Sequence, residues 1–235
     1  MLIEFDHRES NSPYVERIWR SRSRLGGPFL SMADSNIELV FTRLPGFVAA
    51  TLRGPVSQAS FVDCPPDGEW LAIRFRVGTY LPAYPTAALA DHRNAQLPVL
   101  PGGRFWLSGQ AWEIPRFDNA EDFVRGLALA GVVARSDAAS AALDGESLRA
   151  SRRSLERHFH QVTGMTLGGH RQIQRARSAA SLLMRGTPLL DATFDAGYFD
   201  QPHLTRSLKR LVGMTPARLV RERPQLSFSY KTDTL

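Results

Sequence analysis

The chain has 235 residues, of which 43% are hydrophobic and 22% charged, and it carries a formal net charge of +6. This is the composition of an ordinary globular protein with one large core or two smaller ones. The first ten residues carry acids where a secretory signal carries basic residues, no apolar run reaches the length of a bilayer, and a single cysteine, Cys64, excludes an internal disulfide. We therefore expect a cytoplasmic protein without a membrane segment.

The first predicted elements are short β-strands. In EWLAIRFRV, which begins at Glu69, the apolar residues Leu71, Ile73 and Phe75 alternate with a second set of side chains. This period of two predicts a strand with one buried face. Further apolar runs bounded by Gly and Pro predict the other strands, namely YVERIWR, NIELVFT, FVAATL, GPVSQASFV and RFWLSGQAWEI, with a turn at Pro45-Gly46. Several short strands separated by turns favour a sandwich or a small barrel.

A helical period follows. Asp118 and Glu121 stand three residues apart before an apolar run, which predicts an N-cap, and Gly131 predicts the end of the helix. From there the signals are helical almost to the end of the chain. We therefore place a domain boundary near residue 134. It separates a β-rich sensor or regulatory domain (1–134) that ends in a helix from a helical domain (135–224) and a tail (225–235).

The charge divides at the same boundary. Residues 1–134 hold 13 basic and 14 acidic residues, whereas residues 135–235 hold 16 basic and 9 acidic ones, so the net charges are −1 and +7. A basic carboxyl-terminal part predicts a polyanionic partner, although a basic surface also serves solubility alone.

Two stretches of the basic part repeat each other at a constant offset of forty-nine residues. LERHFHQVTGMT begins at Leu155 and LTRSLKRLVGMT begins at Leu204. In both copies, apolar residues at positions i, i+4 and i+7 predict one stripe of a helix. The predicted caps are equivalent as well, with Ser151 and Asp200 at the starts and Gly164 and Gly213 at the ends.

The residues around the second copy predict a helix-turn-helix. A short helix with Thr187 as N-cap and Pro188 as its first residue is followed by a turn at Gly197 and by the repeated helix. Between the copies, GGHRQIQRARSAASLLMRG predicts one linker helix ending at Gly186, with the apolar stripe Ile173, Ala176, Ala180 and Leu183. At about 1.5 Å per residue it spans roughly 25 Å. A spacer of this length suits two helices in successive major grooves, about 34 Å apart.

Over residues 138–222 the sequence resembles the AraC-type family of bacterial transcription regulators. The family pattern S-x-R-x-L-x-R-x-F begins at Ser151, and TG-x-(S/T) begins at Thr163. The second pattern, G-(F/Y)-x-D-x-x-H-(F/L)-x-R-x-(F/L)-K-R-x-x-G-x-TP, runs from Gly197 to Pro216. The resemblance implies an all-α double helix-turn-helix domain that binds DNA. It also implies an amino-terminal cupin-like β-barrel that senses an effector or forms dimers, hence an α+β protein of two domains.

The chain departs from the family pattern in both repeats. Arg149 occupies a position that is usually glycine, so the first helix of the first repeat is expected to be short or irregular. Ala192 and Thr193 stand in place of the usual Ile-Ala pair, and Phe194 is expected to supply the missing apolar bulk. We expect the second unit to be the better-formed reader.

The resemblance implies two groups of DNA contacts. Arginine donates to guanine, glutamate accepts from cytosine and glutamine pairs with adenine, whereas phosphate contacts add affinity without reading sequence. Base contacts are expected from Arg153, Glu156, Arg157, Gln201, His203, Thr205 and Arg206, and phosphate contacts from Arg152, Arg171, Lys209 and Arg210. His158 is expected to pack or lie at the surface, and Leu155, Phe159, Leu204 and Leu208 are expected to be core.

The expected partner is double-stranded DNA in the nucleoid, and we expect no cofactor, metal or catalytic residue. A small-molecule effector, RNA polymerase and a second copy of the chain are further expected partners. We expect an activator, although the sequence does not separate activation from repression. An effector pocket is one interpretation of Trp70, Trp106, Trp112, Phe105, Arg74 and Arg76; the strand alternation favours core aromatics and solvent-facing arginines instead.

Two other functions stay open. A catalytic cupin needs clustered metal ligands, but the amino-terminal part offers only His7 and His92, far apart in sequence. His158 and His160 are two residues apart on a predicted helix and so point in different directions. A non-DNA interaction module built on the same helices is the other alternative, and the salt dependence of DNA binding would separate it from a DNA reader.

Overall fold

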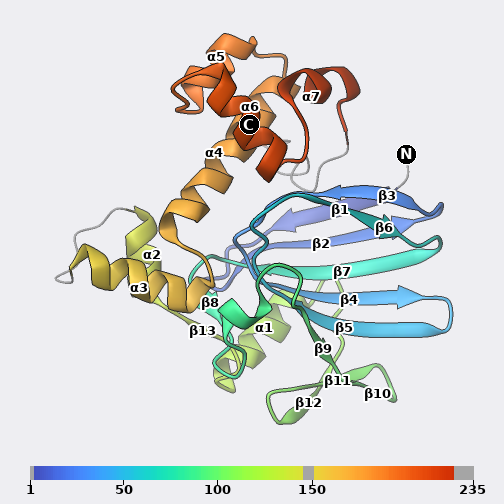
Figure 1. Ribbon diagram of the computed structural model, residues 1–235. Helices are drawn as coiled ribbons and strands as arrows, with labels where there is room; N and C mark the ends of the chain where they lie inside the picture. The colour runs from blue at the N-terminus through green and yellow to red at the C-terminus, as the bar shows by residue number, and fades with distance from the viewer. Residues whose placement is uncertain (1–2, 145–150, 225–235) are drawn as a thin grey trace. The chain divides into compact units, whose positions relative to one another are not determined.

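The computed structural model describes residues 3–144 and 151–224 (Figure 1). The chain forms two compact units that do not follow its order. The first, here the sheet unit, comprises Met1–Gly27, Ser35–Pro55 and Cys64–Leu167. The second, here the reader unit, comprises Pro28–Asp34, Val56–Asp63 and Gly168–Leu235. Both units combine segments from different parts of the chain, so the domain boundary near residue 134 stays a prediction.

The sheet unit is built on one antiparallel sheet with the strand order β1-β2-β7-β4-β5-β9. Its strands are β1 (Ile3–Glu9), β2 (Val15–Ser23), β4 (Glu38–Leu44), β5 (Phe47–Arg53), β7 (Gly68–Phe75) and β9 (Ala95–Leu97). The turn predicted at Pro45-Gly46 joins β4 to β5, with Gly46 at φ +73°. Strand β1 was not predicted, because its charged residues hide the apolar alternation of Ile3 and Phe5.

Smaller elements complete the sheet unit. They are β8 (Thr79–Tyr80), the 3₁₀-helix η1 (Thr86–Leu89), β10 (Val99–Leu100), β11 (Arg104–Leu107), β12 (Gln110–Glu113), α1 (Ala120–Leu129), β13 (Ala134–Arg135), α2 (Asp137–Asp144) and α3 (Arg152–Thr163). Strands β10, β11 and β12 form a second sheet, and β8 pairs with β13. In the described residues the sheets are open, with β1 and β9 as the edges of the main one. The expected cupin-like barrel is therefore not confirmed.

The core of the sheet unit lies on one face of the main sheet. Ile18, Ile73 and Leu39 face one another in register across β2, β7 and β4, and all three are fully buried. Helix α1 adds Val124 and Leu127 to this cluster. Burying each such side chain contributes roughly 1.5–3 kcal/mol, so the amphipathic period of α1 is what holds the helix on the sheet.

The opposite face of β7 contradicts the expected solvent-facing arginines. Arg74 is only 4% exposed, because three polar residues from neighbouring segments surround its guanidinium. Its Nη2 donates to Asn36 Oδ1 at 2.6 Å, and its other nitrogens lie 3.3 Å from Glu16 Oε2 and 3.4 Å from Glu38 Oε1. A buried arginine is tolerated when paired in this way.

The N-cap predicted before α1 is also wrong. Asn119 is the cap residue and makes no side-chain bond to the helix, while Glu121 points elsewhere. The Glu121 carboxylate accepts a hydrogen bond from Ser10 Oγ and another, at 2.7 Å, from Arg8 Nη1. These two bonds, that from Ser10 first, hold the pKa of Glu121 below its ordinary value. The acid at this position therefore ties α1 to the β1–β2 connection rather than capping the helix.

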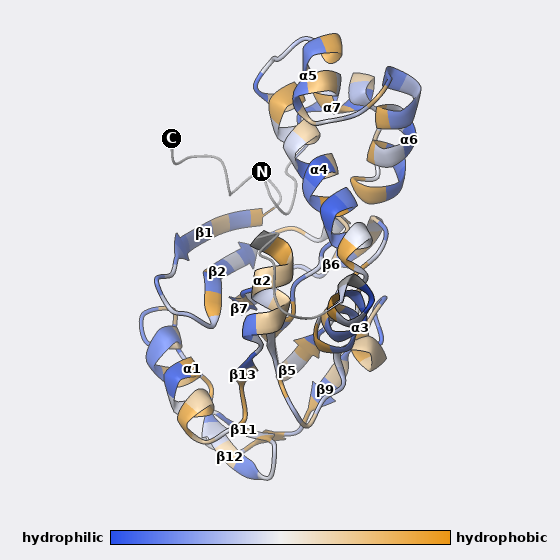
Figure 2. Cartoon of the chain, turned by 90° about the vertical axis from the view of Figure 1, so that its left-hand side faces the viewer, coloured by the Kyte–Doolittle hydropathy of each residue, from blue (hydrophilic) through white to orange (hydrophobic). Residues whose placement is uncertain are grey.

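The reader unit consists of helices and a short β-ribbon. Its elements are α4 (Leu167–Met184), α5 (Leu189–Asp195), α6 (Gln201–Leu211), α7 (Pro216–Glu222), and the paired strands β3 (Gly27–Ser31) and β6 (Ser60–Cys64). The predicted stripe of the linker helix is buried, as are Leu204, Leu208 and Leu211 of α6. Figure 2 shows the matching alternation of hydrophilic and hydrophobic residues along α4 and α6.

Two details of α5 differ from the prediction. Pro188, not Thr187, is the cap residue, and the helix begins one residue later than expected. Phe194 is 59% exposed and does not supply apolar bulk; Ala192 and Thr193 fill the buried side instead. Thr193 fits because its hydroxyl donates to the carbonyl oxygen of Leu189 at 2.6 Å. Within the described residues, no helix has both the length and the apolarity that crossing a membrane requires.

Candidate nucleic-acid interface

Helix α3 presents a polar face opposite a buried one. Ser151 Oγ accepts the backbone N–H of Ser154 at 3.2 Å, and Gly164, at φ +70°, ends the helix, both as predicted. Phe159 and Val162 are buried against Ala139 and Ala142 of α2. The exposed side chains of α3 include the predicted readers Arg153, Glu156 and Arg157, together with His160 and Gln161. Most of α3 is correspondingly blue in Figure 2.

Two other residues of α3 show how its inner side is arranged. His158 Nε2 lies 2.7 Å from Ser136 Oγ, so this ring is engaged with the segment just before α2. Leu155 is half-buried and is not core, in contrast to its equivalent Leu204. The Arg152 side chain and Arg149 lie outside the described part of the chain.

Helix α6 is likewise amphipathic, and its start is marked by both an N-cap and a proline. Asp200 Oδ1 accepts the backbone N–H of His203 at 2.7 Å, and Pro202 lies in the first turn, where no intrahelical N–H bond is lost. The predicted base-contacting residues Gln201 and Arg206 are exposed, and Thr205 is half-exposed.

His203 is held differently from the other predicted readers. Its ring is half-buried and stands edge-on to Tyr198, with ring centroids 5.1 Å apart. Part of this side chain therefore supports the turn before α6.

The turn between α5 and α6 forms at Gly197, as predicted, and is held by Arg175 and Tyr198, which were not expected in this role. Gly197 takes φ +73°, and its carbonyl oxygen accepts from Arg175 Nη1 at 3.1 Å. The Arg175 guanidinium also lies 4.8 Å from the Tyr198 ring centroid, and the Tyr198 hydroxyl lies 2.7 Å from Ser207 Oγ. The pattern from Gly197 to Pro216 contains Tyr198, but Arg175 belongs to the linker helix and has no local signal.

Three of the four predicted phosphate-contacting residues lie on α4 and α6, and the fourth, Arg152, is the first residue of α3. Arg171, Lys209 and Arg210 are exposed. Arg210 Nη2 donates to Gln172 Oε1 at 2.6 Å, so one of these cations is already oriented by a side chain of α4. Lys209 and Arg210 also stand in the last turn of α6, where positive charge stabilises a helix whatever else it does.

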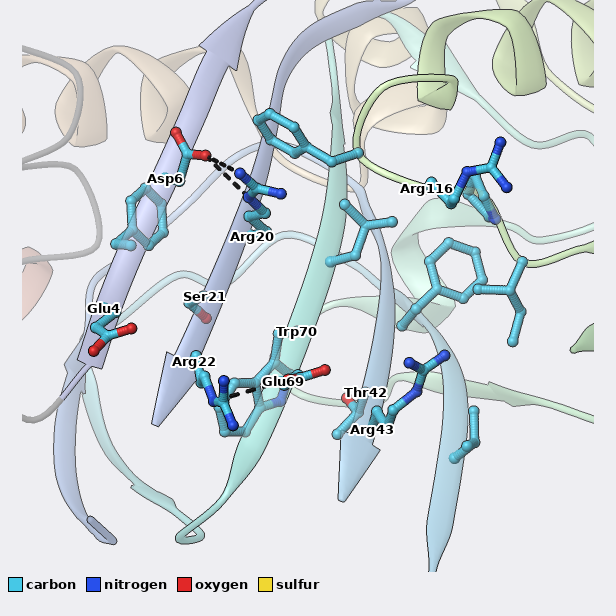
Figure 3. Close-up of a pocket in the computed structure, with 17 residues that line it drawn as sticks. Glu4, Asp6, Arg20, Ser21, Arg22, Thr42, Arg43, Glu69, Trp70 and Arg116 are labelled. Carbon is cyan, nitrogen blue, oxygen red and sulfur yellow. Dashed lines mark hydrogen bonds and ion pairs between the residues drawn. The ribbon is translucent and has the colours of Figure 1, made fainter. Parts of the chain in front are cut away.

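A hollow of about 650 Å³ lies over one end of the main sheet, entirely within the sheet unit (Figure 3). One row of its lining crosses four strands in register with alternating charge, from Glu4 through Arg22 and Glu69 to Arg43. Arg22 and Glu69 approach to 3.8 Å. Opposite charges that face each other on neighbouring strands attract, although Glu4 forms its ion pair with Arg24 instead, at 2.8 Å.

The rest of the hollow combines an apolar floor with cations. Arg20 is engaged, because its Nε and Nη2 donate to Asp6 at 2.9 and 2.7 Å and its guanidinium lies 4.5 Å from the Phe117 ring centroid. Arg43 and Arg116 form no ion pair with any described residue. The apolar lining comes from Phe41, Val48, Leu71, Ile114 and Phe117.

The residues of the predicted effector pocket are not brought together. Trp70 alone of that set lines the hollow. Phe105 is fully buried in the core, Trp106 is 44% exposed, and the Trp112 indole N–H donates to the carbonyl oxygen of Leu107. Arg76 donates to the carbonyl oxygens of Ser12 and Ser10 and so serves the backbone. In the described residues, no group of three or more His, Cys, Asp and Glu side chains is arranged to hold a metal ion.

Two capped amphipathic helices, each with an exposed polar face, and a glycine turn before the second place the carboxyl-terminal part among the helix-turn-helix proteins. Comparison with known families agrees, since residues 145–222 match a family described as a helix-turn-helix domain. This domain is of the AraC type. None of the curated proteins and none of the solved structures matches the chain.

Proposed function

We propose that the protein is a sequence-specific transcription regulator that reads DNA with α3 and α6. The observation that carries this proposal is the repeated helix with an exposed cationic face, found twice at the same offset within a domain of the AraC type. Reading two successive major grooves accounts for the duplication, because the groove itself repeats about every 34 Å.

The proposed roles follow the chemistry of each side chain. Arg153, Arg157 and Arg206 suit guanine, Glu156 suits cytosine and Gln201 suits adenine. Thr205 and His203 are the remaining proposed base contacts. Arg171, Lys209, Arg210 and Arg152 are proposed to contact phosphates, which set affinity and position. A second copy of the chain and RNA polymerase remain expected partners.

We further propose that the sheet unit adjusts this activity by binding a small organic anion in its hollow. Arg43 and Arg116 offer guanidinium groups without an ion pair in the described residues, and Phe41, Leu71 and Ile114 offer an apolar floor. Sites for small molecules combine an apolar lining with a few charged groups in this way. A monocarboxylate with an apolar body matches both features.

DNA retention tests the reading function. Purified protein would be incubated with fragmented host DNA at several salt concentrations, and the retained fragments sequenced. Enrichment of one motif with two blocks, and binding that weakens steeply with salt, supports a sequence reader. Salt-dependent retention without a shared motif would mean a non-specific DNA-coating protein, and salt-independent behaviour would favour the interaction-module alternative.

Ligand binding tests the hollow separately. A series of monocarboxylates of increasing apolar size, each paired with its uncharged amide, would be titrated by calorimetry. We expect a carboxylate to bind and its amide to bind at least about tenfold more weakly, because the amide cannot make a charge-assisted bond to arginine. Arg43→Gln should lower this binding. Equal binding of acid and amide would contradict the proposed anion site.

A further inference from the structure

The glycine that follows each reading helix lies close to a segment from the first 134 residues. Gly164 and Gly213 occupy equivalent positions of the repeat, and both have positive φ, +70° and +87°. A methyl group at Gly164 would lie 2.9 Å from the carbonyl group of Thr86, and one at Gly213 would lie 2.7 Å from Leu30. Because the two glycines are equivalent, each reading helix has a close contact with an earlier segment at the same position of the repeat.

At the second reader, the approaching segment is the ribbon of β3 and β6, taken together with its flanking residues Ala33 and Asp34 after β3 and Ala59 before β6. The last carbonyl groups of a helix have no partner within the helix and must find donors elsewhere. The carbonyl oxygen of Leu211 accepts the backbone N–H of Ala33, and that of Arg210 accepts the backbone N–H of Ala59, both at 2.9 Å. The end of α6 is thus closed by backbone groups from far earlier in the chain.

A buried ion pair fastens the same ribbon to the linker helix. Arg177 Nη2 lies 2.9 Å from Asp34 Oδ2 and donates to the carbonyl oxygen of Ala33 at 2.8 Å. The side chains of Arg177 and Asp34 are only 7% and 21% exposed. A buried arginine requires its partner, so Asp34 fixes where the ribbon lies on α4. Ala33 then stands where its N–H reaches α6.

At the first reader, η1 and β8 take the place of the ribbon. Helix α3 packs against both elements. Tyr80 of β8 lies against the cluster formed by Ala139, Ala142, Phe159 and Val162. Thr86, at the start of η1, is 2% exposed beside Gly164.

We propose that these segments are positioning elements of the DNA readers, with η1 and β8 setting α3 and the ribbon setting α6 through Asp34. The inference rests on the proposed DNA-reading function. The ribbon strands are inserted in the chain between β2 and β4 and between β5 and β7, all strands of the main sheet. The ribbon is therefore continuous in the chain with strands of that sheet, and it reaches the end of α6 through backbone hydrogen bonds.

The test uses the full-length protein and four variants. Asp34→Asn removes the charge that Arg177 needs, Asp34→Glu keeps it, and Leu30→Ala removes contact at Gly213 without changing charge. The matched control is Asp122→Asn, because Asp122 pairs with Arg125 at 2.6 Å with both side chains exposed. Hydrogen exchange of peptides from α3 and α6 would be measured without DNA, followed by retention of each DNA block.

We expect Asp34→Asn and Leu30→Ala to speed exchange at the end of α6 by about tenfold and to weaken binding of the block read by α6 by about tenfold. Asp34→Glu should recover much of both, and Asp122→Asn should change neither. Unchanged exchange in α6, or an equal rise in α3 and α6, would overturn the proposal. If the wild-type protein retains no DNA, the reading function fails while exchange still decides whether the ribbon positions α6.

Discussion

The two copies of the repeated helix share their local signals and differ in their surroundings. Ser151 and Asp200 cap the starts, and Gly164 and Gly213 follow the ends. Beyond these signals, α3 packs on α2, η1 and β8, whereas α6 packs with α5 and the ribbon. A duplicated sequence therefore reproduces helices and caps, while the rest of the chain decides how each copy is held.

The largest expected effect comes from emptying the buried stripe of either copy. Phe159 and Leu208 occupy equivalent positions and are both fully buried. Phe159→Ala should cost about 3–5 kcal/mol and Leu208→Ala about 2–5 kcal/mol of unfolding free energy. Denaturant titration of both variants measures these costs. A cost below about 1 kcal/mol for either would mean that its helix is not packed as described.

The next effect tests the close approach at Gly164. Gly131→Ala is the control, since Gly131 also has positive φ, +71°, but no neighbour within 4 Å of an added methyl group. Both variants should lose about 1–2 kcal/mol of unfolding free energy, because alanine is strained in the left-handed conformation. Gly164→Ala should cost about 1–3 kcal/mol more, because its methyl group meets the Thr86 backbone. Equal melting temperatures would argue against the packing of η1 on the first reader.

The N-caps should behave alike in the two copies, which makes them an internal standard. Ser151→Ala and Asp200→Ala each remove an acceptor for a free backbone N–H, and each should cost about 0.5–2 kcal/mol. Thermal unfolding would compare them. A large cost confined to one copy would show that the other helix does not depend on its local cap.

The smallest expected effect concerns α7, the helix that follows α6, and has no counterpart in α4, which follows α3. In α7, hydrogen bonds from Arg218 and then Arg221 lower the pKa of Glu222 to about 2; the equivalent position in the first copy is Ile173. Because the folded pKa is below the ordinary value of 4.5, the contribution of Glu222 to stability is complete above that pH and is lost as the pH falls toward 2. These side chains are exposed, so the change should be slight.

Acid titration followed by the nuclear magnetic resonance of α7, with Glu222→Gln as control, would measure this effect. In the variant, the amides of α7 should no longer shift between about pH 4.5 and 2. An unchanged titration of those amides would assign it to another group.

The features that could be predicted from the sequence depend on residues that are close together in the chain. The caps at Ser151 and Asp200, the linker helix and the β4–β5 hairpin all follow from local spacing, and the structure confirms them. The exposed polar faces of α3 and α6 were also predicted, whereas the base and phosphate contacts assigned to them stay predictions.

The features that the sequence analysis missed depend on partners far along the chain. Arg74 occupies a position that alternation assigns to solvent, but Glu16 and Glu38 come from other strands and make its burial possible. Glu121 has the spacing of a cap, yet Arg8 and Ser10 offer it better donors. The pairing of Asp34 with Arg177 likewise cannot be predicted from local spacing, because the two residues are far apart in the chain.

Whether both helices read DNA can be decided by footprinting retained DNA with the wild-type protein and two single variants. The wild-type protein should protect two blocks about 10–10.5 base pairs apart. Arg157→Ala should weaken one block and Arg206→Ala the other, each by about 1–3 kcal/mol. Protection of a single block, or the same uniform loss from both variants, would contradict two separate readers.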